Sequence, residues 1–258
     1  MIVKNIYTGK EGFEELKKKY KPVRLIDDYM KTHPTYADNY HYNLETLEVI
    51  QVDKMPRLLN GTYEASTNII RIGKINNTMI HELLHMASSY ENVNFGDSTN
   101  IHEFDTLSEG LTEHLSACIS KSNVNVYIWE SFVAMMLTVS DPETIQTYFD
   151  GMGEDFIGLF NKKDIYDIIL NTYFTRQNVE IETYDDVLDF QKCTRIVLNK
   201  LIDIELAKEK DPQKLKFYRE IFLEGLSTED MRLTFKAGKY KEYHNYAKRL
   251  IDRKIGKW

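Results

Sequence analysis

The chain has few of the residues that would place it in a specialised class of protein. Only two of its 258 residues are cysteines, Cys118 and Cys193, and neither belongs to a CxxC pair, so a disulfide framework is not expected. No window approaches eighteen uncharged apolar residues, and the first twenty residues lack the apolar core of a signal peptide. We therefore expect a globular protein of a reducing compartment, the cytoplasm, without a membrane partner.

Acidic residues outnumber basic ones over most of the chain. The net charge is −7, which argues against a nucleic-acid partner. The exception is the segment 236–258, which carries eight Lys or Arg residues against two acidic ones. We interpret this basic tail as a solvated terminal helix docked on an acidic body. A surface that attracts anionic partners is the alternative.

The first third of the chain mixes helix and strand signals. Residues 11–32 have apolar side chains at helical spacing, and His33-Pro34 ends that pattern. The runs "TLEVIQV" (46–52) and "STNIIRIG" (66–73) are typical of strands, and "LNGTY" between them is typical of a turn. This part predicts a small α/β lobe, residues 1–104, that contains a short and mostly antiparallel sheet.

Almost everything after Asn76 has helical periodicity, which predicts a mainly helical second lobe over residues 105–258. Turn-forming residues between 92 and 105 mark the boundary between the lobes. The fold class expected is α+β. The helices are expected over residues 77–90, 106–121, 125–139, 142–149, 163–174, 184–209, 211–224 and 240–254.

The pentamer His81-Glu82-Leu83-Leu84-His85 is the strongest chemical signal in the chain. Seven His and 40 acidic residues would produce a His-acid-x-x-His pentamer by chance roughly 0.03 times. On a helix, His81 and His85 stand about 40° apart around the axis and can present ring nitrogens to one ion. Glu82 would then lie beside a metal-activated water and accept its proton. The alternative is the polar face of an ordinary amphipathic helix.

A catalytic zinc needs three protein ligands, so a third must come from elsewhere in the chain. Glu109 and Glu113 are four residues apart in "LSEGLTEHLS", and one helix face would carry both carboxylates. Glu109 can ligate the metal while Glu113 accepts the free N–H of a ligand histidine. Two exposed acids on an ordinary helix are the alternative. Less favourable ligand candidates are Glu91, His102, Glu103 and Asp105.

These motifs resemble those of the gluzincin branch of the zincin metallopeptidases. In that family, HExxH on one helix is followed by a glutamate ligand on a later helix, within motifs such as NEG. Ser108-Glu109-Gly110 is similar to that form, and Glu113 matches the acid that often follows. The resemblance covers roughly residues 60–120. It implies a zincin-like fold with the metal site in a cleft between the lobes, and it implies that "ASTNIIRIGK" (65–74) is the edge strand that pairs with an extended substrate.

The resemblance implies a zinc-dependent peptidase that uses one Zn²⁺ ion and acts on peptide or protein substrates; endopeptidase and aminopeptidase activity both fit. His81, His85 and Glu109 would hold the ion and Glu82 would serve as general base. Members of the family commonly add a Tyr or His that stabilises the oxyanion. The residues eligible for that role are Tyr127, Tyr148, Tyr166, Tyr173 and His244.

Two other classes of function fit the same residues. One is a metal-binding or regulatory protein on a zincin fold that does not turn over peptides. The other is a helical interaction protein without metal, whose basic C-terminal tail does the binding. The intact Glu82 speaks against the first of these, because a site without catalysis has no need of that carboxylate.

Overall fold

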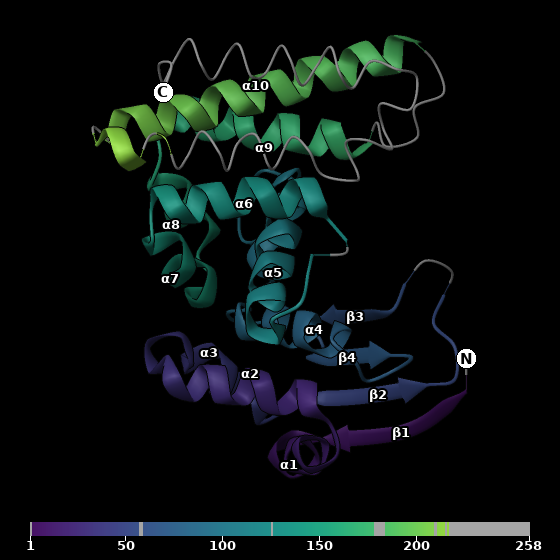
Figure 1. Ribbon diagram of the computed structural model, residues 1–258. Coiled ribbons are helices and arrows are strands. Elements are labelled where there is room, and N and C mark those ends of the chain that lie inside the picture. Colours follow the sequence, from purple (N-terminus) through teal and green to yellow (C-terminus); the bar gives the residue numbers. More distant parts are fainter. Residues whose placement is uncertain are drawn as a thin grey trace. The chain divides into compact units, whose positions relative to one another are not determined.

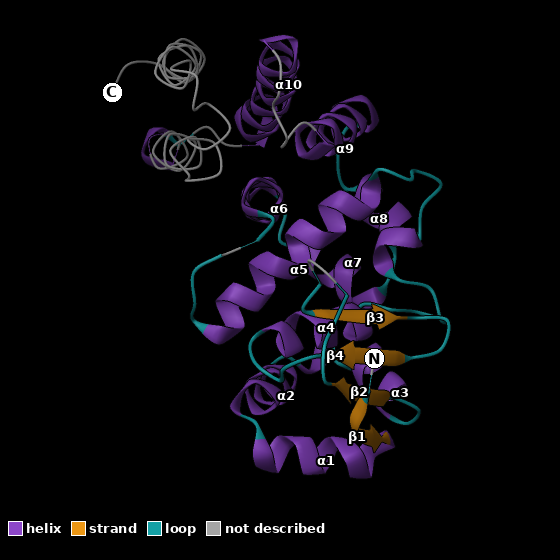
Figure 2. Ribbon diagram, turned by 90° about the vertical axis from the view of Figure 1, so that its right-hand side faces the viewer, coloured by secondary structure: helices purple, strands orange, loops and turns teal. Residues whose placement is uncertain are grey.

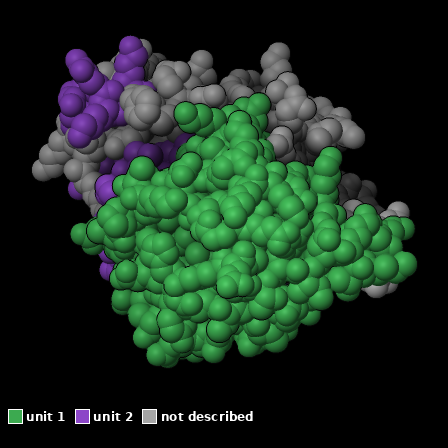
Figure 3. All heavy atoms as spheres, turned by 90° about the horizontal axis from the view of Figure 1, so that it is seen from below, with its two compact units in different colours: residues 1–102, 112–124, 143–156 green, residues 103–111, 125–142, 157–258 purple. Residues whose placement is uncertain are grey.

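The protein is α+β, with one small sheet and a majority of helix (Figure 1). The computed structural model describes residues 2–56, 59–124, 126–177, 184–208, 211–214 and 216. Contacts within the chain define two compact units (Figure 3). Unit 1 comprises residues 1–102, 112–124 and 143–156, and unit 2 comprises residues 103–111, 125–142 and 157–258. The expected division into lobes at residue 104 stays a prediction.

The sheet has four strands in the order β1-β2-β4-β3 (Figure 2). These are β1 (Val3–Thr8), β2 (Glu48–Val52), β3 (Gly61–Glu64) and β4 (Ile69–Ile72). The pairs β1–β2 and β3–β4 are antiparallel, whereas β2 and β4 run parallel. The sheet is therefore mixed, with antiparallel pairing at both of its edges.

The prediction of an edge strand over residues 65–74 is wrong. Ile69–Ile72 form β4, which is paired on both sides, and Ile70 and Ile72 are fully buried. The edge strands are β1 and β3, and β3 begins at Gly61 inside the segment expected to turn. Glycine is depleted in strands, so the residues around Gly61 indicated a turn. Pairing with β4 nevertheless holds this backbone in a strand.

Helices pack around the sheet in the N-terminal part of the chain. They are α1 (Gly9–Lys19), α2 (Lys21–Thr32), α3 (Asp38–Leu44) and α4 (Thr78–Ala87), with short 3₁₀ turns η1 (Pro34–Tyr36) and η2 (Phe95–Asp97). α4 contacts β3 and β4 as well as α2 and α3. This central position explains why eight of its ten residues are buried.

The sequence predicts one helix over residues 11–32, but the structure has two. Tyr20 is extended, with φ −125° and ψ 123°, and Pro22 lies in the first turn of α2. Proline has no N–H, and its ring would clash with the carbonyl four residues earlier, so a helix cannot run through this position without a kink. The predicted end before His33-Pro34 is confirmed, because α2 ends at Thr32.

The later helices, with the exception of α8, lie within a few residues of the expected ranges. They are α5 (Phe104–Ser120), α6 (Ile128–Ser140), α7 (Glu143–Asp150), α8 (Gly153–Gly158), α9 (Lys162–Gln177) and α10 (Tyr184–Lys208). The expected helix 240–254, the basic tail and most of 211–224 lie outside the described residues. Strand β1 and the short helices α3 and α8 were not expected. In the part of the chain that the structure describes, no helix combines the length and the apolar character needed to cross a membrane.

Each unit has its own apolar core. In unit 1, side chains from α1, α2, α3, α4 and the sheet are fully buried, among them Leu16, Ile26, Tyr40, Val52 and Leu83. In unit 2, α9 packs along α10, and α6 contacts both. Its core includes Leu137, Ile165, Ile168, Val197 and Ile202, all without exposed surface. Burial of such side chains contributes about 1.5–3 kcal/mol each, which makes it the main stabilising term in both units.

The C-terminal end of α4 is held by a buried amide. Asn43 on α3 donates hydrogen bonds from Nδ2 to the carbonyl oxygens of Met86 (2.8 Å) and Ser89 (2.9 Å). Asn68, just before β4, donates from its own Nδ2 to the carbonyl oxygen of Asn43 at 2.6 Å. The last carbonyls of a helix have no partner inside the helix, so these bonds satisfy groups that are shielded from water. They tie α3, α4 and the start of β4 together.

Replacing Asn43 by alanine should lower the free energy of unfolding by about 1–3 kcal/mol, because the buried carbonyl of Ser89 loses its donor and the buried carbonyl of Met86 loses one donor beside the Ser89 N–H that it keeps. Urea denaturation followed by circular dichroism measures this change. Asn5→Ala is the matched control, since the Asn5 side chain makes only an exposed hydrogen bond to Gln51 and should cost less than about 0.5 kcal/mol. Equal stability of the two variants would contradict the role assigned to Asn43.

Candidate metal centre

Helix α4 carries three polar side chains at positions that the fold buries. Asn76 Oδ1 accepts a hydrogen bond from the backbone N–H of Thr78 and starts the helix. His81 is 9% exposed and Glu82 is 5% exposed, while His85 is half-buried. Burial of such groups costs free energy unless each finds a partner, so their neighbours decide what this helix face can do.

The two histidines turn the same ring nitrogen toward each other. His81 Nε2 and His85 Nε2 lie 3.1 Å apart, and the ring planes are inclined by 73°. Two nitrogens bound to one tetrahedral zinc, each at about 2.0–2.1 Å, stand about 3.4 Å apart. The distance between the two nitrogens is therefore close to the distance that a single shared cation requires.

The other ring nitrogen of His81 contacts α5. His81 Nδ1 lies 3.2 Å from Glu113 Oε2, and Glu113 is itself buried. A carboxylate accepts hydrogen bonds only, so the His81 proton belongs on Nδ1 and the lone pair belongs on Nε2, on the side of His85. This is the tautomer that a metal ligand needs, and a carboxylate partner raises the basicity of the ring.

A carboxylate completes the group. Glu109 offers an oxygen that lies within 4.8 Å of a ligand nitrogen of each histidine, and His81, His85 and Glu109 could hold a metal ion. Glu109 comes one helical turn before Glu113 on the uninterrupted helix α5, so a continuous helix puts both carboxylates on one face. Two imidazoles and one carboxylate are a donor set that divalent transition metals bind.

The glycine that follows Glu109 has a packing role. A Cβ placed on Gly110 would stand 2.4 Å from the backbone carbon and oxygen of Glu130 on α6. Real side chains never approach that closely, so only glycine lets α5 and α6 meet at this turn. The Ser-Glu-Gly motif thus joins a potential ligand to a close contact between helices.

The less favoured ligand candidates are not in this group. His102 and Asp105 are exposed, and Glu103 is half-buried before the start of α5. Glu91 is exposed in a tight turn, where it has a φ of 49°. In the described part of the chain, His81, His85 and Glu109 are the group of three that the structure brings within ligand distance.

The residues eligible to stabilise an oxyanion lie in different surroundings. Tyr148 is fully buried, and its hydroxyl lies 2.9 Å from Thr112 Oγ1, so it is a core residue. Tyr166 lies under the ammonium group of Lys162, 5.6 Å from ring centre to Nζ. Tyr127 precedes α6 with a left-handed backbone, and Tyr173 lies on α9 beside Phe174. His244 is outside the described residues.

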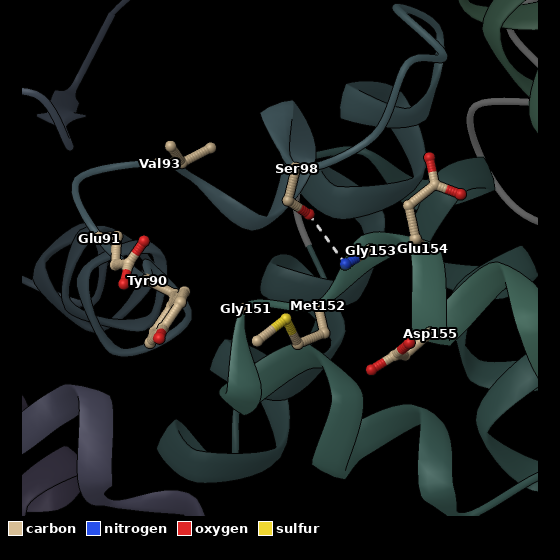
Figure 4. A pocket seen from close by; sticks show the side chains of 9 residues that line it. All are labelled: Tyr90, Glu91, Val93, Ser98, Gly151, Met152, Gly153, Glu154 and Asp155. Atoms are coloured by element: carbon tan, nitrogen blue, oxygen red, sulfur yellow. Dashed lines mark hydrogen bonds between the residues drawn. The ribbon is translucent and has the colours of Figure 1, made fainter.

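A hollow of about 320 Å³ opens elsewhere on unit 1 (Figure 4). The Ser98 hydroxyl accepts a hydrogen bond from the backbone N–H of Gly153 at 2.8 Å in its wall. The residues that line it are Tyr90, Glu91, Val93, Ser98, Gly151, Met152, Gly153, Glu154 and Asp155. None of the residues of the candidate metal centre is among them, so this hollow is a different feature of the surface.

One neighbour of the centre was not expected from the sequence. Gly61, the first residue of β3, lies directly against the carboxylate of Glu82. A glycine inside a strand often marks a close approach of other atoms, which is the signal that could have identified it.

Comparison of the chain with models of protein families, with curated proteins and with solved structures gives no match. The resemblance to gluzincins therefore stays an expectation from the sequence motifs.

Replacing Glu113 by glutamine should weaken metal binding by about 10–100-fold, because the His81 ring loses its charged partner and its fixed tautomer. Competition with a chromophoric chelator measures this affinity for Zn²⁺. Asp28→Asn, an exposed change on α2, is the control and should leave the affinity unchanged. Equal affinities in the two variants would mean that the contact with His81 does not orient a ligand.

Proposed function

We propose that the protein is a zinc-dependent peptidase in which His81, His85 and Glu109 hold the metal and Glu82 is the general base. The observation that carries the proposal is the group of two imidazoles and one carboxylate, with all ligand atoms within 4.8 Å of one another. Zinc is proposed over other divalent metals because it accepts neutral imidazole and carboxylate in a tetrahedral set. When bound, the ion supplies Lewis acidity that activates water and polarises a carbonyl.

The place of Glu82 on α4 and its burial support a role in proton transfer. It follows His81 directly on α4, so its side chain leaves the helix about 100° from that ligand. It is 5% exposed, and a buried carboxylate is well placed to take a proton from an attacking water and return it to the leaving nitrogen. A purely structural metal site would have no use for this group.

The edge strand beside α4 supports a peptide as substrate. β3 is the last strand of the described sheet on its side, and it packs against α4. An extended peptide can add to such an edge through backbone hydrogen bonds, and this mode of binding requires no particular side chains. In this proposal β3 takes the role that the sequence analysis gave to residues 65–74.

The remaining parts of the proposal follow from the same features. A four-stranded mixed sheet followed by helices is compatible with a zincin-like arrangement, which we include in the proposal. Cys118 and Cys193 are free thiols, which supports a reducing compartment such as the cytoplasm. The competing function is a metal-binding or regulatory protein without turnover, and the same helix pair would serve it. A helical interaction protein without metal is favoured by no observation in the described part of the chain.

Replacing Glu82 by glutamine should abolish most hydrolysis and leave metal binding intact. The expected loss in kcat is about 10²–10⁴-fold, the usual contribution of a general base. Mass spectrometry of a peptide library after incubation measures cleavage, and plasma mass spectrometry measures metal content. Glu91→Gln, an exposed acid in a turn, is the control. Undiminished cleavage by Glu82→Gln would exclude it as the base, and zinc-loaded parent protein that cuts nothing would favour the regulatory alternative.

Replacing Glu109 by alanine should lower the zinc content well below one ion per chain after dialysis, since two histidines alone bind weakly. The same dialysis of the parent chain is the reference. Metal content equal to that of the parent would transfer the ligand role to another acid or histidine, with His102 and Asp105 the first to test.

A further inference from the structure

Gly61 faces Glu82 at a distance that leaves no room for a side chain. A Cβ placed on Gly61 would stand 2.7 Å from Glu82 Oε1, 3.0 Å from Cγ and 3.1 Å from Cδ. Non-bonded carbon atoms are at their best separation at about 3.5–4.0 Å, so all three contacts would be too close. The end of the Glu82 side chain therefore lies across the bare face of Gly61.

The backbone gives no other reason for a glycine at this position. Gly61 pairs in regular antiparallel register with Ile72, and it is not one of the glycines with positive φ, which in the described residues are Gly9 and Gly151. Glycine weakens a strand because it loses more conformational freedom than other residues and packs no side chain. The close approach of the Glu82 carboxylate is the reason that the structure gives for a glycine at this position, despite its cost to the strand.

A small rotation of the carboxylate would not relieve the contact. Turning about the Cγ–Cδ bond moves the two oxygens but leaves Cγ and Cδ in place, and both are too close to the added Cβ. Glu82 would have to change its χ1 or χ2 angle, or β3 would have to separate from α4. The side chain is 5% exposed on a helix that is buried on most sides, so neither change leaves the carboxylate where it is.

We infer that Gly61 is a positioning residue for the general base. Because Gly61 has no side chain, it leaves the space in which the Glu82 carboxylate keeps its working position beside the metal ligands. This inference rests on the proposed function. A general base must lie within about 2.6–3.2 Å of the proton that it takes, and a misplacement of about 1 Å can cost about 10²-fold in rate. The three atoms nearest to the added Cβ all belong to Glu82, so the metal ligands should keep their geometry.

Steady-state kinetics of Gly61→Ala test the inference in the zinc-loaded full chain. We expect kcat for a cleaved library peptide to fall about 10²-fold, with KM within about threefold of the parent and zinc content unchanged. Gly73→Ala, one residue past β4, is the matched control, because its Cβ would meet only Met55, at 3.2 Å from Cγ of the flexible side chain and 3.9 Å from the backbone nitrogen. A kcat for Gly61→Ala within about threefold of the control overturns the inference.

Thermal unfolding of the metal-free protein provides a readout that does not depend on activity. Gly61→Ala should lower Tm by about 2–6 °C in the parent chain, because the added methyl group overpacks the contact. In a Glu82→Ala background the same change should not lower Tm, because the space is then open. An equal loss in both backgrounds overturns the inference.

The two experiments separate the failure of the inference from the failure of the proposed function. A parent protein that binds zinc but cleaves no peptide overturns the proposed peptidase, whatever the unfolding data show. A parent protein that cleaves peptides while Gly61→Ala behaves like Gly73→Ala overturns the positioning role alone.

Discussion

The 3.1 Å approach of two imidazole nitrogens is the constraint on which the rest of this site depends. Two lone pairs cannot face each other at that distance without something positive between them. Because Glu113 accepts the proton of His81 on Nδ1, the Nε2 atoms of the two rings are left to a cation that both can share.

Three different kinds of contact fix the helix that carries these groups. Asn43 binds the carbonyls at its C-terminal end, Glu113 binds His81 from α5, and Gly61 approaches Glu82 from β3. Each contact restrains a different side of α4. Metal sites and catalytic sites need such support, because their geometry tolerates errors of only about 0.5 Å.

The sequence predicted what depends on short spacing and missed what depends on pairing across the chain. Helical periodicity places His81 with His85, and Glu109 with Glu113, on one face of a helix each. The need of a catalytic zinc for a third ligand then joined the two pairs. Pro22 also indicates the break at Tyr20. The apolar residues keep helical spacing on both sides of it, however, so a single helix was predicted. Strand order, by contrast, is set by partners distant in the chain, so β3 was taken for a turn and β4 for an edge. The contact of Gly61 with Glu82 also depends on how separate segments of the chain pack together, so the sequence did not predict it.

Helix α4 has only ten residues, whereas isolated helices of fewer than about 12–15 residues are marginal in water. The Asn43 side chain binds the carbonyl of Met86 in the last turn and that of Ser89 just past the helix, and it lies 43 and 46 positions earlier in the chain than these two acceptors. Contacts with α3 and the sheet therefore stabilise the helical form of this segment. The pairing of the two imidazoles is thus a product of cooperative folding, so ligand geometry and the folded state of unit 1 arise in the same step.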